Sequence, residues 1–322
     1  MKTFLFALLT LLAALFGSAG QASAQTCTFT VSNMAFGSAD LTTGAAVDST
    51  ATMAVTCVGL AGRTVRLCPS IGDGTGGSNS LGSPRQLTDG LGNQIAYTFF
   101  SDAARTNIWG SWVWPWSASF PGPQFDLALG STGVASASYT LYGRILASQP
   151  TVVPGSFTLS FAGHTLMAYG YSTIGTCPAI GSARNATPSF SVSATNLRNC
   201  TLSTTAMNFG TQSVLSSNID STASLLVRCS RTVPYTIAMN EGLWGSPTGP
   251  VRRMANGANR VTYQLYGNAA RTLIWFNGGS TYLGSGTGTG TSQTLTVYGR
   301  VPSQTTPPSG VYNDTVVVTV TY

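Results

Sequence analysis

Short segments that alternate polar and apolar residues recur along the chain, separated by stretches rich in Gly, Pro, Ser and Asn. Residues 138–142, 156–161 and 189–194 alternate in this way, and residues 315–322 form a run rich in β-branched side chains. Such runs, with turn residues at intervals of about ten positions, are typical of an all-β sandwich. We find no convincing 3.6-residue periodicity after residue 24. The pattern therefore predicts an all-β fold.

The first 24 residues predict an export signal. Lys2 supplies a positive charge, residues 4–16 form an apolar run, and Ala22-Ser-Ala24 fits the small-residue rule for cleavage. The apolar run is too short to span a bilayer comfortably, and an uncleaved anchor is the alternative interpretation. We expect residues 1–24 to be removed, so that the mature chain begins at Gln25.

Two parts of the chain match each other in the same order. Cys27–Gly37 resembles Cys200–Gly210, and Asp48–Ala51 recurs as Asp220–Ala223. Further matching pairs are Arg63–Val65 with Arg231–Val233, Ala103–Trp109 with Ala269–Trp275, and Leu141–Arg144 with Val297–Arg300. Ordered matches of this kind indicate a duplicated domain. We expect an N-terminal domain over residues 25–195 and a C-terminal domain over residues 196–322, each large enough for its own core.

The cysteine count indicates disulfides. The six cysteines are Cys27, Cys57, Cys68, Cys177, Cys200 and Cys229. An even number in an exported chain is typical of a disulfide framework. The Cys27–Cys57 spacing recurs in Cys200–Cys229, which predicts one equivalent bridge in each copy. The other two have no counterparts, so we expect them to pair together, with free thiols or links between chains as alternatives.

Charged residues are scarce, which narrows the possible functions. The 322 residues include 15 Lys and Arg, 9 Asp and Glu, and one histidine, His164. Acid–base and metal chemistry usually draw on histidines and clustered carboxylates, so we expect no catalytic residue, no metal site and no cofactor. The arginines are scattered and form no basic stripe, which argues against a nucleic-acid partner.

A tryptophan-rich segment over residues 109–123 is the sharpest local feature. Trp109 matches Trp275 of the second copy, so we expect it in the core. The apolar residues in or beside the insertion that follows are Trp112, Val113, Trp114, Trp116 and Phe120. We expect these to form an exposed surface-binding loop, and Val152 and Val153 lie in a turn that is a further candidate. A loop folded back onto the domain and a sugar-stacking site are the alternatives.

The two copies end differently. The first copy continues into an extra segment, in which residues 189–194 either complete the domain or form the linker. The second copy stops on the hydrophobic strand over residues 315–322. Two interpretations stay open: the second domain is complete, or it lacks its last strand and needs one from another chain.

The repeated order of motifs resembles one known family. Cys-x-[Phe/Leu] leading to Met-x-Phe-Gly, then Asp-Ser-Thr-Ala, a cysteine and a late Tyr-Gly-Arg occur twice. This order is similar to that of the spore coat protein U domain family, which includes pilins of archaic, Csu-type chaperone–usher pili. The resemblance covers nearly the whole mature chain. It implies two immunoglobulin-like, pilin-type sandwiches, with the final strand missing from the C-terminal one.

The resemblance also implies partners. These are a periplasmic chaperone, an outer-membrane usher and an adjacent pilin that donates a strand. The edge that would receive the strand carries Val316, Val318, Val320 and Tyr322. Only two residues precede Cys27 in the expected mature chain, which leaves no room for a donor strand of its own. We therefore expect a subunit that is exported through the periplasm to the cell surface and lies at the pilus tip.

These observations predict a non-enzymatic tip adhesin. Its N-terminal domain would attach to hydrophobic abiotic or host surfaces through apolar loops and so promote biofilm formation. A structural pilus or spore-coat component without an adhesive role, a carbohydrate-binding adhesin and a hydrolase are the alternatives.

Overall fold

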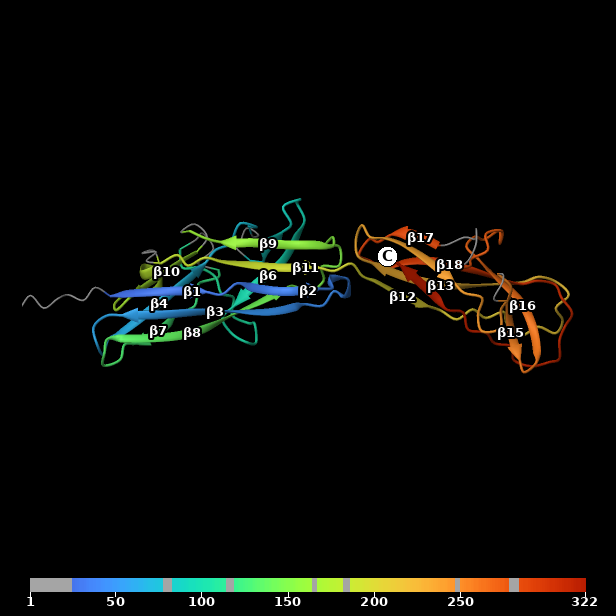
Figure 1. Ribbon diagram of the computed structural model, residues 1–322, viewed down its shortest axis with the longest axis horizontal. Coiled ribbons are helices and arrows are strands. Elements are labelled where there is room, and N and C mark those ends of the chain that lie inside the picture. Colours follow the sequence, from blue (N-terminus) through green and yellow to red (C-terminus); the bar gives the residue numbers. More distant parts are fainter. Residues whose placement is uncertain are drawn as a thin grey trace, which may run out of the picture.

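The computed structural model shows an elongated chain of two β domains placed end to end (Figure 1). It describes residues 25–77, 83–113, 119–163, 167–181, 186–246, 250–277 and 284–322. The first domain contains β1 to β11 and the second contains β12 to β19. The all-β prediction is confirmed. The helical elements of the described residues are the 3-10 turn η1 (Leu41–Thr43) and the short helix α2 (Cys177–Gly181), which the sequence did not predict.

The described residues of the first domain form eleven strands. They are β1 (Thr26–Val31), β2 (Met34–Ala39), β3 (Val47–Val58), β4 (Thr64–Ile71), β5 (Arg85–Thr88), β6 (Gln94–Phe100), β7 (Phe125–Ala128), β8 (Val134–Ile145), β9 (Gly155–Phe161), β10 (Met167–Ser172) and β11 (Phe190–Asn196). One sheet has the order β1-β3-β8-β6-β5-β9-β11-β2, and a second has the order β10-β4-β7. β11 is antiparallel to β9 and parallel to β2. The alternating segment 189–194 is therefore the strand that joins β9 to β2.

In the second domain, the part of the chain that the structure describes forms eight strands. They are β12 (Cys200–Thr204), β13 (Ile219–Cys229), β14 (Pro234–Met239), β15 (Arg252–Asn256), β16 (Asn259–Tyr266), β17 (Gly284–Thr287), β18 (Gln293–Val301) and β19 (Val318–Thr321). They form the sheets β12-β13-β18-β16-β15 and β17-β14-β19. This domain repeats much of the first, with β13 and β18 matching β3 and β8.

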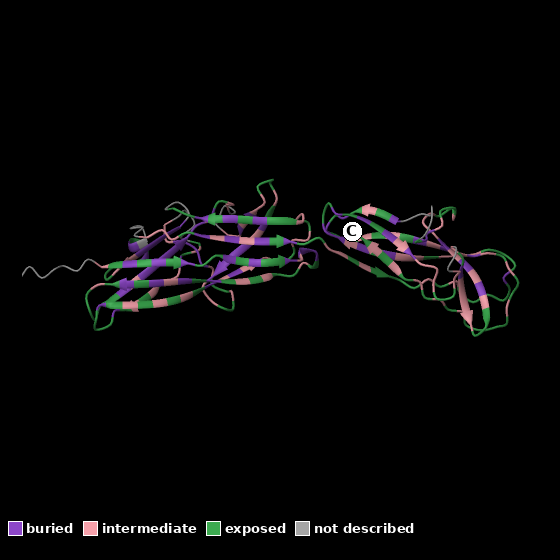
Figure 2. Cartoon of the chain, in the orientation of Figure 1, coloured by how far each residue is buried: buried purple, intermediate pink, exposed green. Residues whose placement is uncertain are grey.

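Each domain has its own hydrophobic core. Inward and outward residues alternate along the strands, as expected when one face of a sheet is buried, and Figure 2 shows this alternation as bands of colour. Trp109 and Trp275 are both fully buried, which confirms that this matched pair is structural. Residues 167–170 of β10 are also buried, so the extra segment of the first copy supplies a core strand.

Three disulfides brace the fold. The bridges are Cys27–Cys57, Cys200–Cys229 and Cys68–Cys177. These are the pairings that the repeat predicts. The first two link the opening strand of each domain to the strand beside it. The third ties α2 to β4, because Cys177 begins the helix and Cys68 lies in that strand.

A matched set of charges stabilises the central strand pair of each domain. Arg144 on β8 donates two hydrogen bonds to Asp48 on β3, at 2.7 and 2.9 Å. Arg300 makes the same pair of contacts with Asp220, at 2.7 and 2.8 Å. The hydrogen bonds from Arg144 and Arg300 lower the pKa of Asp48 and Asp220 below their ordinary values. The recurring Asp-Ser-Thr-Ala motif is therefore structural.

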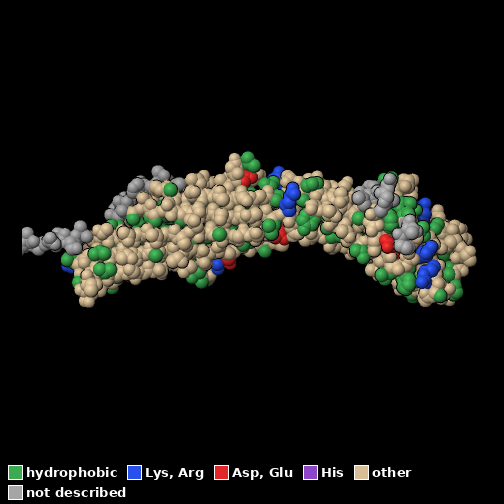
Figure 3. Space-filling view, in the orientation of Figure 1, with side chains coloured by type: hydrophobic (Ala, Val, Ile, Leu, Met, Phe, Trp, Pro, Cys, Tyr) green, Lys and Arg blue, Asp and Glu red, His purple; other side chains and the backbone are tan. Residues whose placement is uncertain are grey.

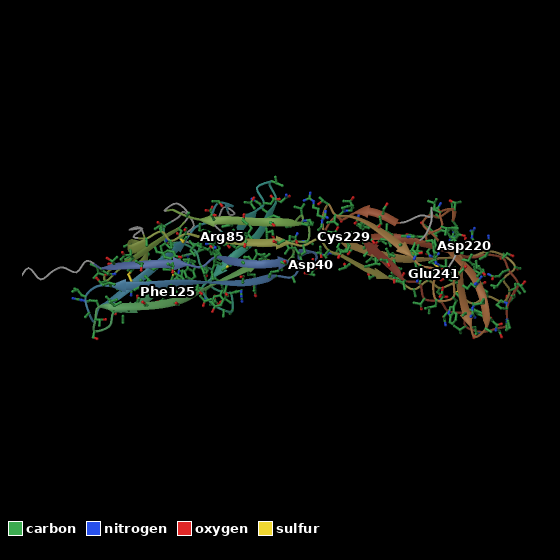
Figure 4. All side chains as sticks on the ribbon, in the orientation of Figure 1. Asp40, Arg85, Phe125, Asp220, Cys229 and Glu241 are labelled. Atoms are coloured by element: carbon green, nitrogen blue, oxygen red, sulfur yellow. A yellow bond between two sulfur atoms is a disulfide. The ribbon has the colours of Figure 1, made fainter. Side chains whose placement is uncertain are left out.

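The junction between the domains is short and hydrogen-bonded. The Nδ2 of Asn199 donates to Oδ2 of Asp40 at 2.6 Å, and the hydroxyl of Tyr322 donates to Oδ1 of Asn199 at 3.3 Å. Figure 4 shows Asp40 at the end of the first domain that faces the second. The C-terminal residue therefore lies back at the junction, as Figure 1 also shows.

Candidate strand-acceptor groove and surface-binding loops

A groove of about 400 Å³ lies in the second domain. One wall is formed by residues 204–207 and 209, and the other by residues 312–316 and 318. Its floor is mostly apolar and consists of Ala223, Ser224, Leu225, Met239, Met254, Tyr263, Leu265 and Val297. The groove therefore exposes part of the hydrophobic core along the line between two chain segments.

Neither wall of the groove is a fully paired strand. Residues 205–212 form no strand, and residues 311–317 contain only an isolated bridge between Asn313 and Ala255. The equivalent segments of the first domain are the regular strands β2 and β9, and both pair with β11. Each wall of the groove thus offers backbone N–H and C=O groups, and a strand placed between the two walls would form hydrogen bonds with them.

Local contacts fix which residues correspond in the two domains. A Cβ on Gly143 would meet Met34 and Phe36, and a Cβ on Gly299 would meet Met207 and Phe209. On the other wall, Thr158 of β9 pairs with Thr88, as Asn313 pairs with Ala255. This correspondence places Tyr312, Asp314 and Val316 where the first domain has Phe157, Leu159 and Phe161.

In the first domain β11 fills the corresponding position. Phe190, Val192 and Ala194 point inward and are buried. The ring of Phe190 stacks on Phe161 at a centroid distance of 4.7 Å. At the end of the strand, the Nδ2 of Asn196 donates to the backbone carbonyls of Val152 and Val153, each at 3.0 Å. The first domain is thus completed by a strand that leads directly into the second.

One charged side chain lies among the apolar groups of the groove. Asp314 accepts the hydroxyl of Tyr263 at 2.6 Å and the backbone N–H of Leu243 at 2.8 Å. Burial raises the pKa of Tyr263 above its usual range, and the hydrogen bond to Asp314 raises this pKa further. Tyr263 therefore stays a neutral hydrogen-bond donor beneath the groove.

A buried arginine supports the same region in both domains. Arg252 donates to the backbone carbonyls of Met239 at 3.1 Å and Trp275 at 2.7 Å. Arg85 makes the matching bonds to Ile71 and Trp109, each at 2.9 Å. Burial lowers the pKa of Arg252 and of Arg85 to about 10 in each case. Sequence reasoning missed this pair, although both arginines begin the strand that follows the long Gly- or Pro-containing loop.

Two of the four predicted edge residues line the groove. Val316 and Val318 lie in its wall. Val320 pairs with Ile237 of β14 and packs against the core. Tyr322 is exposed and reaches Asn199 at the junction. This wall of the groove therefore consists of residues 312–316 and of Val318, the first residue of β19.

The described part of the tryptophan-rich segment packs onto the first domain. Trp112 is half-buried, contacts the cluster formed by Cys68, Cys177 and Ile180, and donates from Nε1 to the carbonyl of Pro123 at 3.1 Å. Val113 and Phe120 are half-buried too. Trp114 and Trp116 lie outside the described residues, as does His164.

The candidate turn with Val152 and Val153 lies at the end of the first domain that is opposite Trp112. Val152 and Val153 are half-buried and pack against its core. Their carbonyls accept hydrogen bonds from Asn196, next to the linker. The structure therefore does not bring these valines together with Trp112.

Exposed apolar side chains gather at the end of the first domain remote from the linker. Leu60 is 54% exposed in the β3–β4 loop, and Ile174 is 80% exposed in the loop before α2. Val58 and Val134 flank Leu60 on paired strand ends and are also exposed. The start of β4, which follows the first loop, lies beside the second loop, because Arg66 pairs with Ser172 and donates to the carbonyl of Gly175. Sequence reasoning missed this end patch, defined by Val58, Leu60, Val134 and Ile174.

Charge is distributed unevenly over the surface. On the face in Figure 3, charged side chains are sparse over the first domain, and arginines gather over the far end of the second. Among the described residues there is no group of His, Cys, Asp and Glu suited to hold a metal ion. The same part of the chain contains no helix that is long and apolar enough to cross a membrane.

Comparison with known proteins identifies the family. The Spore Coat Protein U domain matches residues 13–161 and 186–319, one match for each half. The chain therefore belongs to the Spore Coat Protein U domain family, and the predicted resemblance is confirmed.

Two particular proteins illustrate this relationship. Protein U of Myxococcus xanthus is 38% identical over 128 residues, which is 36% of this chain and 71% of that protein. The chain is also similar to a crystal structure of the CsuC–CsuE chaperone–tip adhesion subunit pre-assembly complex of Acinetobacter baumannii. That match has a TM-score of 0.54 and 20% identity, and covers 92% of this chain and 100% of the other. The likeness supports a fold of two consecutive pilin-type domains.

Proposed function

We propose that this chain is a non-enzymatic tip adhesin of a chaperone–usher pilus. The observation that carries the proposal is the difference between the two domains. β11 completes the first domain from within the chain, whereas no strand of the described chain fills the groove of the second. A subunit with this layout joins a fibre through its second domain and presents its first domain at the end.

The partners follow from the groove. An exposed strip of core is an aggregation hazard in a free subunit, so a periplasmic chaperone covers it first. The outer-membrane usher then exchanges the chaperone for the strand of an adjacent pilin, by strand addition at the open edge. In support, the similar crystal structure from Acinetobacter baumannii contains a tip adhesion subunit in complex with its chaperone. The disulfides fit this route through an oxidising compartment to the cell surface.

The first domain supplies the adhesive surface in this proposal. The end patch points away from the second domain, and its leucine and isoleucine are largely exposed. Burying one such side chain against an apolar surface contributes about 1.5–3 kcal/mol. Trp114 and Trp116 of the predicted loop are further candidates. Many fibres acting together add avidity, which supports attachment to hydrophobic abiotic or host surfaces and biofilm formation.

A groove-filling substitution tests the fibre role. Ala223 lines the groove and Thr222 on the same strand is exposed, so Ala223→Trp and Thr222→Trp form a matched pair. We expect Ala223→Trp to abolish co-purification with the chaperone and incorporation into fibres, and Thr222→Trp to leave both intact. Equal chaperone binding by both variants contradicts the acceptor role.

Attachment to polystyrene tests the adhesive role separately. We expect Leu60→Ser with Ile174→Ser to reduce attachment strongly while fibres assemble normally. Trp114→Ser with Trp116→Ser tests the loop in the same assay. Trp112 serves less well, because it packs on the Cys68–Cys177 bridge and its removal disturbs the fold. Undiminished attachment by both double variants rules out adhesion through these loops.

A structural coat or shaft component is the second candidate. The family's description as a spore coat domain favours it. The similarity to Protein U of Myxococcus xanthus, which spans about one domain's length of this chain, is compatible with this role. Immunogold labelling separates the two functions: label at fibre ends supports the adhesin, and label along fibres or over the cell envelope supports the structural role.

A further inference from the structure

Asp314 occupies a position that the first domain gives to a core leucine. Leu159 is 3% exposed and pairs with Val192 of β11. A Cβ on Gly74 would touch Leu159, and a Cβ on Gly242 at the matching place would touch the carboxylate of Asp314. The two side chains therefore point the same way, toward the core beneath the groove.

The first domain shows how a strand would meet this position. Residues directly opposite each other in an antiparallel pair project to the same face, with Cβ atoms about 4.5–5.5 Å apart. Val192 faces Leu159 in this way, while Phe190 faces Phe161 and Ala194 faces Phe157. A strand in the second groove with the same register places one inward side chain against Asp314, between neighbours that face Val316 and Tyr312.

A strand at this position would remove water from a carboxylate. Asp314 now holds the Tyr263 hydroxyl on Oδ2, and the N–H groups of Leu243 and Thr315 on Oδ1. An ionised carboxylate offers about four acceptor sites, so one remains on Oδ2. Burying that site under an aliphatic side chain is unfavourable, whereas a hydroxyl or amide would satisfy it.

The apolar floor of the groove favours a neutral donor over a cationic one. That floor consists mostly of apolar side chains, among them Leu225, Met254 and Val297. An ammonium or guanidinium group would lose its hydration there, which costs far more than the desolvation of a hydroxyl or amide.

We propose that the pilin strand accepted by this groove carries a hydroxyl or amide side chain at the position facing Asp314, where β11 has Val192. Asp314 is then a specificity-determining residue that distinguishes the partner's strand from the chain's own β11. This inference rests on the proposed acceptor function. It adds that the partner strand has a large apolar residue facing Val316, a hydrogen-bond donor facing Asp314 and a small residue facing Tyr312.

Two peptides and two proteins test the inference. The peptides copy Pro188–Leu197, one with Val at position 192 and one with Thr, which has nearly the same shape. The proteins are the full chain and its Asp314→Leu variant, which gives the second groove the first domain's residue. Because β11 occupies the first domain, labelled peptide bound to the full chain reports on the second groove, and fluorescence polarisation gives each Kd.

The full chain should bind the Thr peptide about five- to tenfold more tightly than the Val peptide, the ratio expected for one net hydrogen bond. Asp314→Leu should reverse that preference. A Val preference of equal size in both proteins overturns the inference and leaves the acceptor role standing. Failure of both peptides to bind either protein overturns the acceptor role and the inference together.

A second variant keeps the test decisive if Asp314→Leu fails to fold. Asp314→Asn keeps the size of the side chain and one acceptor oxygen but loses the charge, so the preference for Thr should shrink. An unchanged ratio would show that the carboxylate does not select the strand. Retention of the wild-type unfolding transition of the second domain is the control for folding.

Discussion

Replacement of Phe190 by Ala tests whether β11 is an integral strand of the first domain. The side chain is 4% exposed, stacks on Phe161 with centroids 4.7 Å apart, and contacts Phe99 at 6.0 Å. Removing a buried phenylalanine costs about 3–5 kcal/mol, including the cavity that remains. A domain of this size loses about 2–4 °C in Tm per kcal/mol, so we expect a fall of about 6–20 °C.

Differential scanning calorimetry of the full chain measures this effect. The first domain should unfold at lower temperature in Phe190→Ala, while the transition of the second domain stays where it is. Thr195→Ala is the matched control, because Thr195 lies on the exposed face of the same strand, and it should change stability by about 0.5 kcal/mol or less. A loss below about 1 kcal/mol in Phe190→Ala would refute the reasoning, since a linker that merely lies on the surface tolerates truncation.

Three further predictions concern other parts of the fold. Gly299→Ala should destabilise the second domain by about 1–3 kcal/mol, because the new Cβ would meet Met207. Gly130→Ala is the control, since a Cβ at that position makes only an ordinary contact with the carbonyl of Val134. Urea unfolding measures both variants, and equal losses of stability would contradict the packing argument. Replacing Cys68 and Cys177 together by Ala should destabilise the first domain by about 4–5 kcal/mol in the chain-entropy model and spare the second, and calorimetry of the two transitions checks this. Because the pKa of Asp220 is lowered in the folded state, its ionised form stabilises the fold at pH values above the ordinary carboxyl pKa of about 3.9, and this stabilisation is lost as the pH falls through the lowered pKa. Asp220→Asn should therefore flatten the acid-unfolding profile below about pH 4. A profile as steep as that of the wild type would contradict this prediction.

The repeat made much of the fold predictable. Two copies of the same motifs at nearly the same spacing fixed the pairing of Cys27 with Cys57 and of Cys200 with Cys229, because equivalent positions in a duplicated fold make equivalent contacts. The β class followed from alternation along segments such as β9 and β11. Alternation could not decide whether residues 189–194 complete the domain or link it to the next, because a strand has the same pattern in either position.

The site was harder to predict because it depends on contacts between distant segments. Trp112 was expected to be exposed because it lies in or beside an insertion, but the bridge between Cys68 and Cys177 brings α2 beside it. Arg85 and Arg252 were scattered charges in the sequence, and only the fold shows that they bind the carbonyls behind the two buried tryptophans.

The exposure of the end patch was likewise invisible in the sequence. Leu60 and Ile174 are single apolar residues in ordinary turns, so no local pattern marks them. Their loops meet only because β4 and β10 are neighbours in one sheet. Asp314 also gave no local signal, since a single carboxylate just before a β-branched run is an ordinary feature of a surface segment.

The central claim is that the groove of the second domain accepts a strand in the manner of β11. A copy of Phe190–Asn196 added after Tyr322 tests it directly, through a Gly/Ser linker of about eight residues, which spans the ~20 Å back to Val316. Calorimetry should show the second domain unfolding at higher temperature, with the first domain unchanged. A control extension, in which the inward and outward residues exchange places, should leave both transitions unaltered. Equal transitions for the two extended chains would contradict the account.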